Sequence, residues 1–362
     1  MTTTSIAFDQ AKSEEFAGRM LTILNDGALA LMISVGHRAG LLDTLAALPR
    51  ATSAELAGAA GLNERYVREW LAALVTGRIV DYDPLDRTYA LPAEHAAWLT
   101  RAASPSNLAT TCQFIPLMGA VEEAILSAFR SGGGLHYHAY HRFHEVMAED
   151  SAQTVVAALF DAILPLVPGL SPALADGIDV LDLGCGRGQA LIALAQAFPR
   201  SRFAGYDLSE ETTAYAQEQV RQLGLGNIRF AALDAARLDE PSRYDLICTF
   251  DAIHDQADPA RVLRNIRRAL RPGGTYLMQD IRAASELHGN LEHPAAPLLY
   301  TISTFHCTSV SLAADGAGLG TMWGEELALA MLAEAGFGAV EVHQLAHDFM
   351  NSYYTARPGA AR

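Results

Sequence analysis

Lysine is almost absent from this sequence, and Lys12 is the only one. A phosphate-binding loop or a Schiff base that depends on lysine is therefore excluded beyond that position. Arginine carries nearly all of the positive charge, and the 26 Lys plus Arg stand against 41 Asp plus Glu, for a formal net charge of −15. This acidic balance disfavours a protein that simply coats nucleic acid or an anionic membrane.

Cysteine is also scarce: the chain has four, and none of them forms a CxxC pair. In a chain of 362 residues this count is no disulfide signature, so we expect reduced thiols. The segment Met1 to Ser5 lacks the basic and apolar regions of a signal peptide. The most apolar early stretch, Ala28 to Val35, is too short to span a bilayer. Together these absences predict a soluble cytoplasmic protein.

Residues 1–100 are predicted to form an α-rich domain. Apolar residues at helical spacing predict a helix from Glu14 to Val35, and a capping box at Thr52–Glu55 predicts the start of another. A further helix at Tyr66–Leu74 is followed by a strand, a turn and a second strand that ends at Leu91. Helix, tight turn, helix and hairpin is the plan of a winged helix-turn-helix domain.

Winged helices often bind DNA, but the charge of this one favours another use. Its candidate recognition helix carries Glu64 and Glu69 beside Arg65 and Arg68, so its charge is balanced. DNA-binding modules usually present a basic face. The sustained apolar pattern of the first helix suits a subunit interface better. We therefore expect a dimerisation or packing module, with DNA binding as the less favoured alternative.

Residues 101–175 are predicted to form a helical connector, with helices at about 117–129 and 153–166. Between them lie three successive glycines and then four histidines within nine residues. A metal site is one interpretation, but His136 and His138 would diverge on a helix, and no cysteine or carboxylate pattern completes a known site. The glycines followed by Tyr and His favour a mobile lid with aromatic walls over a pocket, and a solvent-exposed loop is the other alternative. We predict no metal ligands.

Residues 176–362 alternate strand and helix, which is typical of a doubly wound parallel sheet. The first strand runs into Gly184-Cys-Gly186-Arg-Gly188, where glycines let the backbone turn sharply and let a ligand approach the main chain. A dinucleotide-binding loop needs GxGxxG, and its third glycine would fall at Gln189. Asp182, just before the loop, would also repel a pyrophosphate. The loop favours a ligand that carries an amino group and a sulfonium.

The segment Asp182-Leu-Gly-Cys-Gly-Arg-Gly188 resembles motif I of the class I S-adenosylmethionine-dependent methyltransferases. Asp207 and Asp234 follow the second and third strands, where that family has the acidic residues for the ribose hydroxyls and near the adenine amino group. Phe250 to His254 ends the fourth strand, where the family lines the cleft between cofactor and acceptor. The residues that the resemblance assigns to the cofactor are Asp182, Gly184, Cys185, Gly186, Gly188, Asp207, Leu208, Asp234, Ala235, Phe250 and Asp251.

The same resemblance implies a Rossmann-like, seven-stranded methyltransferase sheet preceded by the winged-helix domain. The whole chain is similar to a bacterial group with such an N-terminal domain and a helical connector over the cleft. The winged-helix part also resembles the dimerisation module of small-molecule O-methyltransferases. It implies a homodimer that moves a methyl group from S-adenosylmethionine to a small molecule and leaves S-adenosylhomocysteine. O-methylation is slightly favoured over N-, S- or C-methylation.

His254 is the candidate catalytic base, because it comes just after the fourth strand. In-line methyl transfer needs alignment, and a hydroxyl acceptor gains about 10²–10⁴-fold from a general base. Asp255, or Asp251 nearby, would orient the His254 ring. A structural or cofactor-binding role for His254 is the alternative. His306 and Cys307, in a long insert at about 281–321, are weaker candidates for the wall of the acceptor site.

Other functions fit the sequence less well. A winged-helix transcriptional regulator that binds the cofactor, with little or no methyltransferase activity, would be favoured by a basic recognition helix, which is absent. A nicotinamide dehydrogenase is disfavoured by the GxGxG spacing. Macromolecular acceptors usually need an open and often basic groove, whereas much of this chain is predicted to form a cover. Base methylases often carry an Asn-Pro-Pro-Tyr-like motif where this chain has Phe250-Asp-Ala-Ile253.

Overall fold

The structure, a computed structural model, describes residues 8–359. Met1 to Ser5, which the sequence predicts not to be a signal peptide, lie outside the described residues. The chain divides into two compact units, Met1–Pro116 and Leu117–Arg362. The first unit holds the predicted winged-helix domain. The second holds the sheet and the larger part of the predicted connector.

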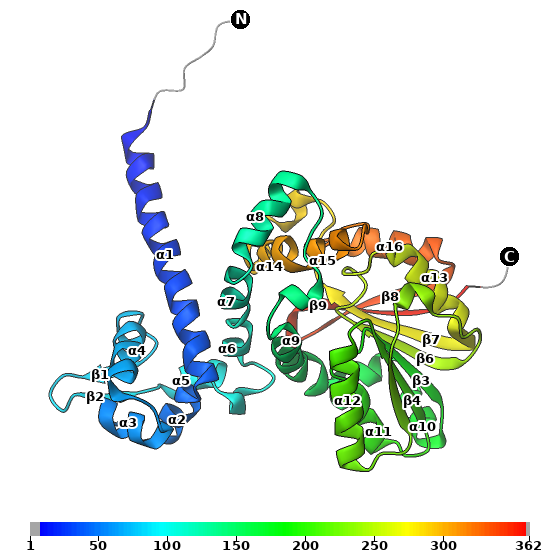
Figure 1. Cartoon of the computed structure of the whole chain (residues 1–362), viewed down its shortest axis with the longest axis horizontal. Helices are drawn as coiled ribbons and strands as arrows, with labels where there is room; N and C mark the ends of the chain where they lie inside the picture. Colours follow the sequence, from blue (N-terminus) through cyan, green and yellow to red (C-terminus); the bar gives the residue numbers. More distant parts are fainter. Residues whose placement is uncertain (1–7, 360–362) are drawn as a thin grey trace, which may run out of the picture. The chain divides into compact units, whose positions relative to one another are not determined.

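The first unit is mainly helical and has one short hairpin (Figure 1). Its elements are α1 (Gln10–Arg38), α2 (Leu41–Ala47), α3 (Ser53–Ala60), α4 (Glu64–Thr76), β1 (Asp81–Asp83), β2 (Thr88–Ala90), α5 (Ala93–Leu99), a 3₁₀ turn (Arg101–Ala103) and α6 (Leu108–Thr111). Thr52 and Glu55 exchange the two hydrogen bonds of the predicted capping box. Leu42, Leu56 and Leu71 lie fully buried in the core of this unit. The element order is that of the predicted winged-helix domain.

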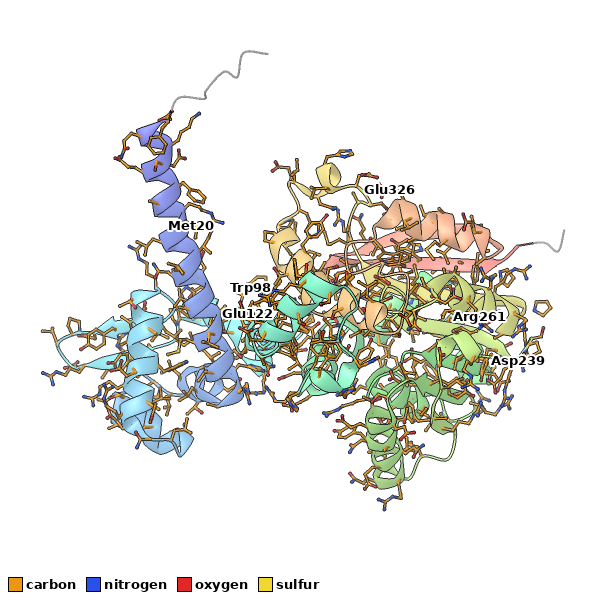
Figure 2. The ribbon with its side chains drawn as sticks, turned by 45° about the horizontal axis from the view of Figure 1, so that its top comes forward. Met20, Trp98, Glu122, Asp239, Arg261 and Glu326 are labelled. Carbon is orange, nitrogen blue, oxygen red and sulfur yellow. The ribbon has the colours of Figure 1, made fainter. Side chains whose placement is uncertain are left out.

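Helix α1 packs on its own unit only near its carboxyl end. There a Cβ added to Gly36 would come within 2.5 Å of the Trp70 ring, so the two helices touch closely. Further toward the amino end, the large apolar side chains of Phe16 and Leu24 are exposed, as is that of Met20 (Figure 2). Among residues 8–359, α1 is the only individual helix that is long and apolar enough to cross a membrane. Two further pairs of helices meet the same length and composition criteria only if each bent pair is counted as one membrane span. From the sequence, only Ala28 to Val35 was considered as a possible membrane span, so the length of this apolar helix, which has 29 residues, was underestimated.

The connector is more broken than the sequence predicts. The expected helix at about 117–129 is two helices, α7 (Phe114–Gly119) and α8 (Glu122–Ser131). In place of the expected helix at about 153–166, the chain forms π turns followed by a 3₁₀ turn. The elements after α8 are a 3₁₀ turn (Tyr137–Ala139), α9 (Phe143–Ser151), π turns (Ala152–Val156 and Leu159–Ile163), a 3₁₀ turn (Leu164–Leu166) and α10 (Leu170–Asp176). Leu159, Ile163 and Leu164 are buried against the sheet's helices, so core packing outweighs regular helix geometry here.

The second unit is built on a seven-stranded sheet in the order β5-β4-β3-β6-β7-β9-β8. Its strands are β3 (Asp179–Leu183), β4 (Arg202–Asp207), β5 (Ile228–Ala232), β6 (Tyr244–Phe250), β7 (Leu270–Ile281), β8 (Phe337–Leu345) and β9 (Asp348–Pro358). The first five are parallel, and β9 is antiparallel to both β7 and β8. The predicted doubly wound sheet is confirmed. Its order reverses between β3 and β6, and open α/β sheets bind ligands at the carboxyl ends beside such a reversal.

Helices cover both faces of the sheet (Figure 1). One face carries α10, α11 (Gln189–Ala197) and α12 (Glu210–Leu223), and the other carries α13 (Pro259–Ala269) and α16 (Glu325–Glu334). Neighbouring strand residues alternate between the two cores: Val180 faces the first and Leu181 the second. The insert before α16 forms a 3₁₀ turn (Leu287–Asn290), α14 (Ala296–Ile302), a π turn (Ser303–Cys307) and α15 (Thr308–Ala313).

Candidate active site

The glycine loop after β3 has the backbone geometry that only glycine adopts easily. Gly184, Gly186 and Gly188 have φ values of 78°, 51° and 71°. A Cβ on Gly188 would lie 2.4 Å from the Phe230 ring, whereas a Cβ on Gly186 would meet nothing within 4 Å. The loop is therefore held tightly at its helix end and has room for a ligand at its middle glycine.

Asp182, at the end of β3, is buried, and its Oδ1 has no hydrogen-bond partner in the part of the chain that the structure describes. Burial and the nearby Asp207 raise the pKa of Asp182 to about 7. A buried carboxylate without a partner is costly unless a cation or a donor reaches it. The amino group and sulfonium of S-adenosylmethionine supply positive charge of this kind, so the residues present fit that cofactor.

Asp207, at the end of β4, forms hydrogen bonds with both the glycine loop and the N-cap residue of α12. Its Oδ2 accepts a hydrogen bond of 2.8 Å from the Gly186 amide, and its Oδ1 accepts one of 2.9 Å from the Ser209 amide. Each carboxylate oxygen can accept a further hydrogen bond. The side chain is thus fixed in place with acceptor capacity left for a pair of hydroxyls. The neighbouring Leu208 side chain is exposed.

The other predicted cofactor residues also follow strand ends. Asp234 comes after β5, accepts a 2.9 Å hydrogen bond from the Ala236 amide and begins the 3₁₀ turn that contains Ala235. Phe250 ends β6 and is half-buried. Asp251 has a φ of 50°, and burial, followed by the Asp280 charge, raises its pKa to about 8. The residues therefore share the carboxyl edge of β3 to β6, and their contacts with a cofactor stay predictions.

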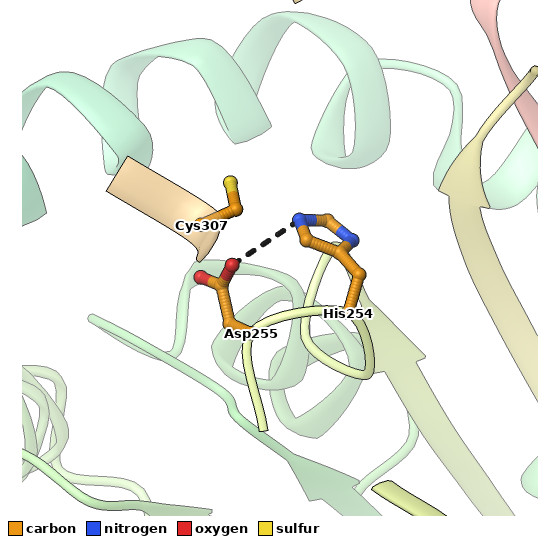
Figure 3. Close-up of side chains that lie close together, drawn as sticks. All are labelled: His254, Asp255 and Cys307. Atoms are coloured by element: carbon orange, nitrogen blue, oxygen red, sulfur yellow. Dashed lines mark ion pairs between the residues drawn. The ribbon is translucent and has the colours of Figure 1, made fainter. Parts of the chain in front are cut away.

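His254 is buried just beyond this edge, and Asp280, the penultimate residue of β7, holds its ring. The His254 Nδ1 lies 2.6 Å from Asp280 Oδ1, and a carboxylate oxygen accepts, so Nδ1 donates. Trp323 Nε1 donates to the same oxygen at 3.0 Å. The other ring nitrogen, Nε2, lies 3.4 Å from Asp255 Oδ1 (Figure 3). Asp280 therefore orients the ring, whereas the predicted partner Asp255 lies at the opposite, reactive nitrogen.

The charges around His254 favour its protonated form before a ligand arrives. Burial alone disfavours that charge, but Asp280, Cys307 and Asp255 outweigh it and raise the His254 pKa well above its usual value. His306, in the π turn of the insert, behaves in the opposite way. Burial lowers its pKa to about 4, so that ring is neutral.

The segment after the three glycines packs over this cluster. Tyr137 donates a 2.9 Å hydrogen bond from its hydroxyl to Asp255 Oδ2, and Tyr140 donates one of 2.6 Å to the Phe305 carbonyl. The Phe143 ring stacks on His306, with 3.7 Å between ring centroids. Aromatic side chains therefore wall the cluster, as the sequence predicts for a lid. That this segment moves stays a prediction.

Two parts of the chain match known protein families. Residues 27–101 match the family described as Rv2258c-like winged HTH domain, and residues 174–335 match the family described as methyltransferase domain. The second match contains the glycine loop, Asp207 and the His254 cluster. The chain therefore carries a methyltransferase domain that follows a winged-helix domain.

Curated relatives match this methyltransferase over part of its length. The ubiquinone biosynthesis O-methyltransferase of Leptothrix cholodnii is 30% identical over 108 residues, which is 29% of this chain and 45% of that protein. The ribosomal RNA small subunit methyltransferase G of Stenotrophomonas maltophilia is 37% identical over 128 residues, 35% of this chain and 56% of that protein. The chain thus spans about half the length of the curated relatives it matches.

Solved structures match the methyltransferase along nearly its whole length. Human N-acetylserotonin methyltransferase in complex with S-adenosylmethionine is 17% identical with a TM-score of 0.69, covering 99% of this chain and 100% of that one. PigF with S-adenosylhomocysteine is 19% identical with a TM-score of 0.67, covering 97% and 100%. The mitomycin 7-O-methyltransferase MmcR is 21% identical with a TM-score of 0.67, covering 96% and 100%. At these identities the likeness establishes the fold.

Neither Asp280 nor Trp323 was singled out from the sequence, and Tyr137 was predicted only as part of an aromatic lid and not as a partner of Asp255. Asp280 lies at the end of the fifth parallel strand, so the strand-end rule that selected Asp207 could also have selected it. Trp323 follows the insert and Tyr137 precedes the sheet domain, and no sequence spacing links either to His254. Only packing brings them together.

Proposed function

We propose that this methyltransferase transfers a methyl group from S-adenosylmethionine to an oxygen of a small-molecule acceptor. The observation that carries this proposal is a buried His254 whose Nδ1 is held by Asp280 while Nε2 stays available, a few residues beyond the strand that neighbours the glycine loop. A ring held in this way serves as a general base for a hydroxyl. The likeness to human N-acetylserotonin methyltransferase and to the mitomycin 7-O-methyltransferase MmcR supports the acceptor class.

The cofactor would lie at the carboxyl edge of the sheet. Asp182 would face its positive charge, Asp207 would accept hydrogen bonds from the ribose hydroxyls, and Asp234 would lie near the adenine amino group. Gly186, where a side chain would have open space, would let the ligand approach the backbone. When bound, S-adenosylmethionine would supply a methyl group on a good leaving group.

The chain's own residues then align and deprotonate the acceptor. His254 Nε2 would accept the proton of the acceptor hydroxyl as its oxygen takes the methyl group that the bound cofactor would supply. His254 acts after it has lost its own proton, a loss that a cationic ligand in the same pocket favours. Asp280 stabilises the imidazolium that forms. Alignment in a closed, water-poor site supplies up to about 7–11 kcal/mol of the barrier reduction, and the aromatic residues Tyr137 and Phe143 would exclude water.

A methyl-transfer assay tests this proposal directly. The full-length protein is incubated with isotope-labelled S-adenosylmethionine and a panel of phenols, other alcohols, amines and thiols, and labelled product is identified by mass. We expect label on the oxygen of a phenol or alcohol. Label only on nitrogen, sulfur or carbon would refute the O-methylation proposal, and cofactor binding without transfer to any acceptor would favour the regulator alternative.

We also propose that the protein is a cytoplasmic homodimer through its first unit. Helix α1 exposes Phe16, Met20 and Leu24, and a second copy of the same helix would cover them. The arginines of α4 already form ion pairs within the helix, Arg65 with Glu69 and Arg68 with Glu64, which leaves little free charge for DNA.

Sedimentation of the full-length protein tests the dimer. Wild type prepared without detergent should sediment as a dimer, and Leu24→Glu should shift it toward the monomer. Arg19→Glu, on the same helix, is the matched control and should remain dimeric. A wild-type monomer, or recovery of the protein only with membranes, would contradict this proposal.

A further inference from the structure

Three different donor types converge on one buried point of the second unit. The side chains are those of His254, Asp255 and Cys307, and their ligand atoms all lie within 4.8 Å of one another (Figure 3). His254 and Asp255 follow β6, whereas Cys307 comes from the π turn of the insert. An imidazole, a carboxylate and a thiol form a donor set that Zn²⁺ binds.

The surroundings of His254 match those of a metal-ligating histidine. Such a histidine usually donates its second ring N–H to a carboxylate, which fixes the ring and leaves the other nitrogen for the metal. Here Nδ1 donates to Asp280 Oδ1 at 2.6 Å, and Trp323 Nε1 anchors that oxygen at 3.0 Å. A second group of possible ligands, Asp251, His254 and Asp280, is less suitable, because the Nδ1 it would need in place of Nε2 is already hydrogen-bonded.

The spacing of the ligand atoms is close to that of a tetrahedral site. With metal–nitrogen and metal–oxygen bonds of about 2.0–2.1 Å, two ligands at a tetrahedral angle lie about 3.3 Å apart. His254 Nε2 and Asp255 Oδ1 are 3.4 Å apart. Cys307 Sγ lies within 4.8 Å of the other two ligand atoms, and in a tetrahedral site with a metal–sulfur bond of about 2.3 Å it would lie about 3.6 Å from each of them.

An unsatisfied polar atom of Asp255 lies at this point, and another belongs to the neighbouring His306, whose other ring nitrogen, Nδ1, is 3.8 Å from Asp255 Oδ2. Asp255 Oδ1 and His306 Nε2 are buried and have no hydrogen-bond partner in residues 8–359. The side chain of Asp255 is only 9% exposed, and the ion-pair contacts described for it are with histidines. A carboxylate and a thiolate together neutralise a divalent ion, so metal binding would keep the buried Asp255 carboxylate paired once His254 has lost its proton.

We propose that His254 Nε2, Asp255 and Cys307 form a binding site for one zinc-class divalent ion. The fourth position is open to water or to a ligand oxygen. Binding needs no oxidant or reductant: His254 loses its Nε2 proton and Cys307 loses its thiol proton, both to solvent, and the metal takes the lone pairs that are freed. A metal at this point removes the base of the proposed reaction, so zinc should inhibit methyl transfer.

Cobalt spectroscopy tests this site without relying on activity. The full-length protein, freed of metal by a chelator, is titrated with Co²⁺ and its absorption spectrum is recorded. We expect saturation at one ion per chain, with the bands of tetrahedral cobalt and a thiolate-to-cobalt charge-transfer band, and we expect Zn²⁺ to displace the cobalt. Absence of the charge-transfer band in the wild type overturns the proposal, even if surface histidines bind cobalt adventitiously.

Variants locate the site. Cys307→Ser should lose the charge-transfer band, and Cys112→Ser, a change to a cysteine of the first unit, should keep it. Losing a group that only hydrogen-bonds a metal ligand weakens metal binding by about 10–100-fold. Asp255→Asn removes a proposed ligand and should therefore weaken Zn²⁺ binding by more than this. Circular dichroism checks that each variant is folded. A band that survives in folded Cys307→Ser, or unchanged zinc affinity in folded Asp255→Asn, overturns the proposal.

The outcome is separable from that of the proposed methyl transfer. Metal binding is measured with no cofactor or acceptor present, and methyl transfer is measured in metal-free protein with chelator. If no acceptor is methylated, the cobalt spectrum still decides the metal site. If methyl transfer occurs and Zn²⁺ at saturating occupancy leaves its rate unchanged, the metal does not take the Nε2 lone pair and the assigned ligand set is wrong.

Discussion

The two halves of the candidate site are built in different ways. The cofactor half uses short segments at successive strand ends, with Asp182 near the end of β3, Asp207 at the end of β4 and Asp234 just after β5. The acceptor half gathers His254, Asp280 and residues of the insert and the connector around one buried point. The first half therefore depends mainly on local backbone geometry, and the second on the packing of distant segments.

The difference also concerns charge. In the cofactor half, the carboxyl group of Asp182 has no positively charged partner among the described residues. In the acceptor half, the imidazolium of His254 balances the charge of the neighbouring carboxylates. Changes in the first half should therefore alter cofactor affinity, and changes in the second should alter turnover. Four experiments test this separation.

The largest effect is expected from His254→Ala. Loss of the proposed base should lower kcat by about 10²–10⁴-fold, while cofactor affinity measured by calorimetry stays close to that of the wild type. Asp239→Asn, an exposed change in the same unit, is the control (Figure 2). Normal turnover by folded His254→Ala would show that the ring only shapes the pocket.

Asp207→Ala should act on the other half. It removes the hydrogen bond to the Gly186 amide and would remove the proposed acceptor of the ribose hydroxyls. A hydrogen bond to a charged group contributes about 1.5–3 kcal/mol, so the cofactor dissociation constant should rise by about 100-fold in calorimetry. Unchanged affinity would remove S-adenosylmethionine from this edge of the sheet.

Asp280→Asn should give a smaller loss of turnover. An amide can present its NH₂ group to His254 Nδ1 and favour the wrong tautomer, so kcat should fall by about 10–100-fold. The expected signature is a change in kcat with little change in cofactor affinity. A variant that loses both equally would mean that Asp280 supports the fold of the whole edge and not the ring alone.

The smallest effect is the pH dependence of cofactor binding. The pKa of Asp182 is raised to about 7, so its carboxyl is mostly neutral at pH 6 and mostly ionised at pH 8. A cationic cofactor prefers the ionised form, so affinity should rise about tenfold between these pH values. In Asp182→Asn this dependence should disappear, and a wild-type affinity that falls with pH would reverse the assigned sign.

Much of the fold could be predicted because its signals are local. The capping box of Thr52, the alternation of strand and helix after residue 176 and the strand-end aspartates each depend on a few neighbouring residues. The connector was harder to predict. Its apolar spacing indicated two continuous helices, but the chain breaks between α7 and α8 and widens into π turns where Leu159 and Ile163 pack into the core.

The sequence by itself determined the strand-end positions of the residues that we predict to bind the cofactor. A glycine that must adopt a positive φ and an aspartate at the end of a strand are visible in the order of residues, because backbone geometry at those positions depends on near neighbours. Only the tertiary structure decided the acceptor half. Asp280 rather than Asp255 holds His254, and Cys307 lies beside both, because burial brings together side chains that no sequence spacing connects.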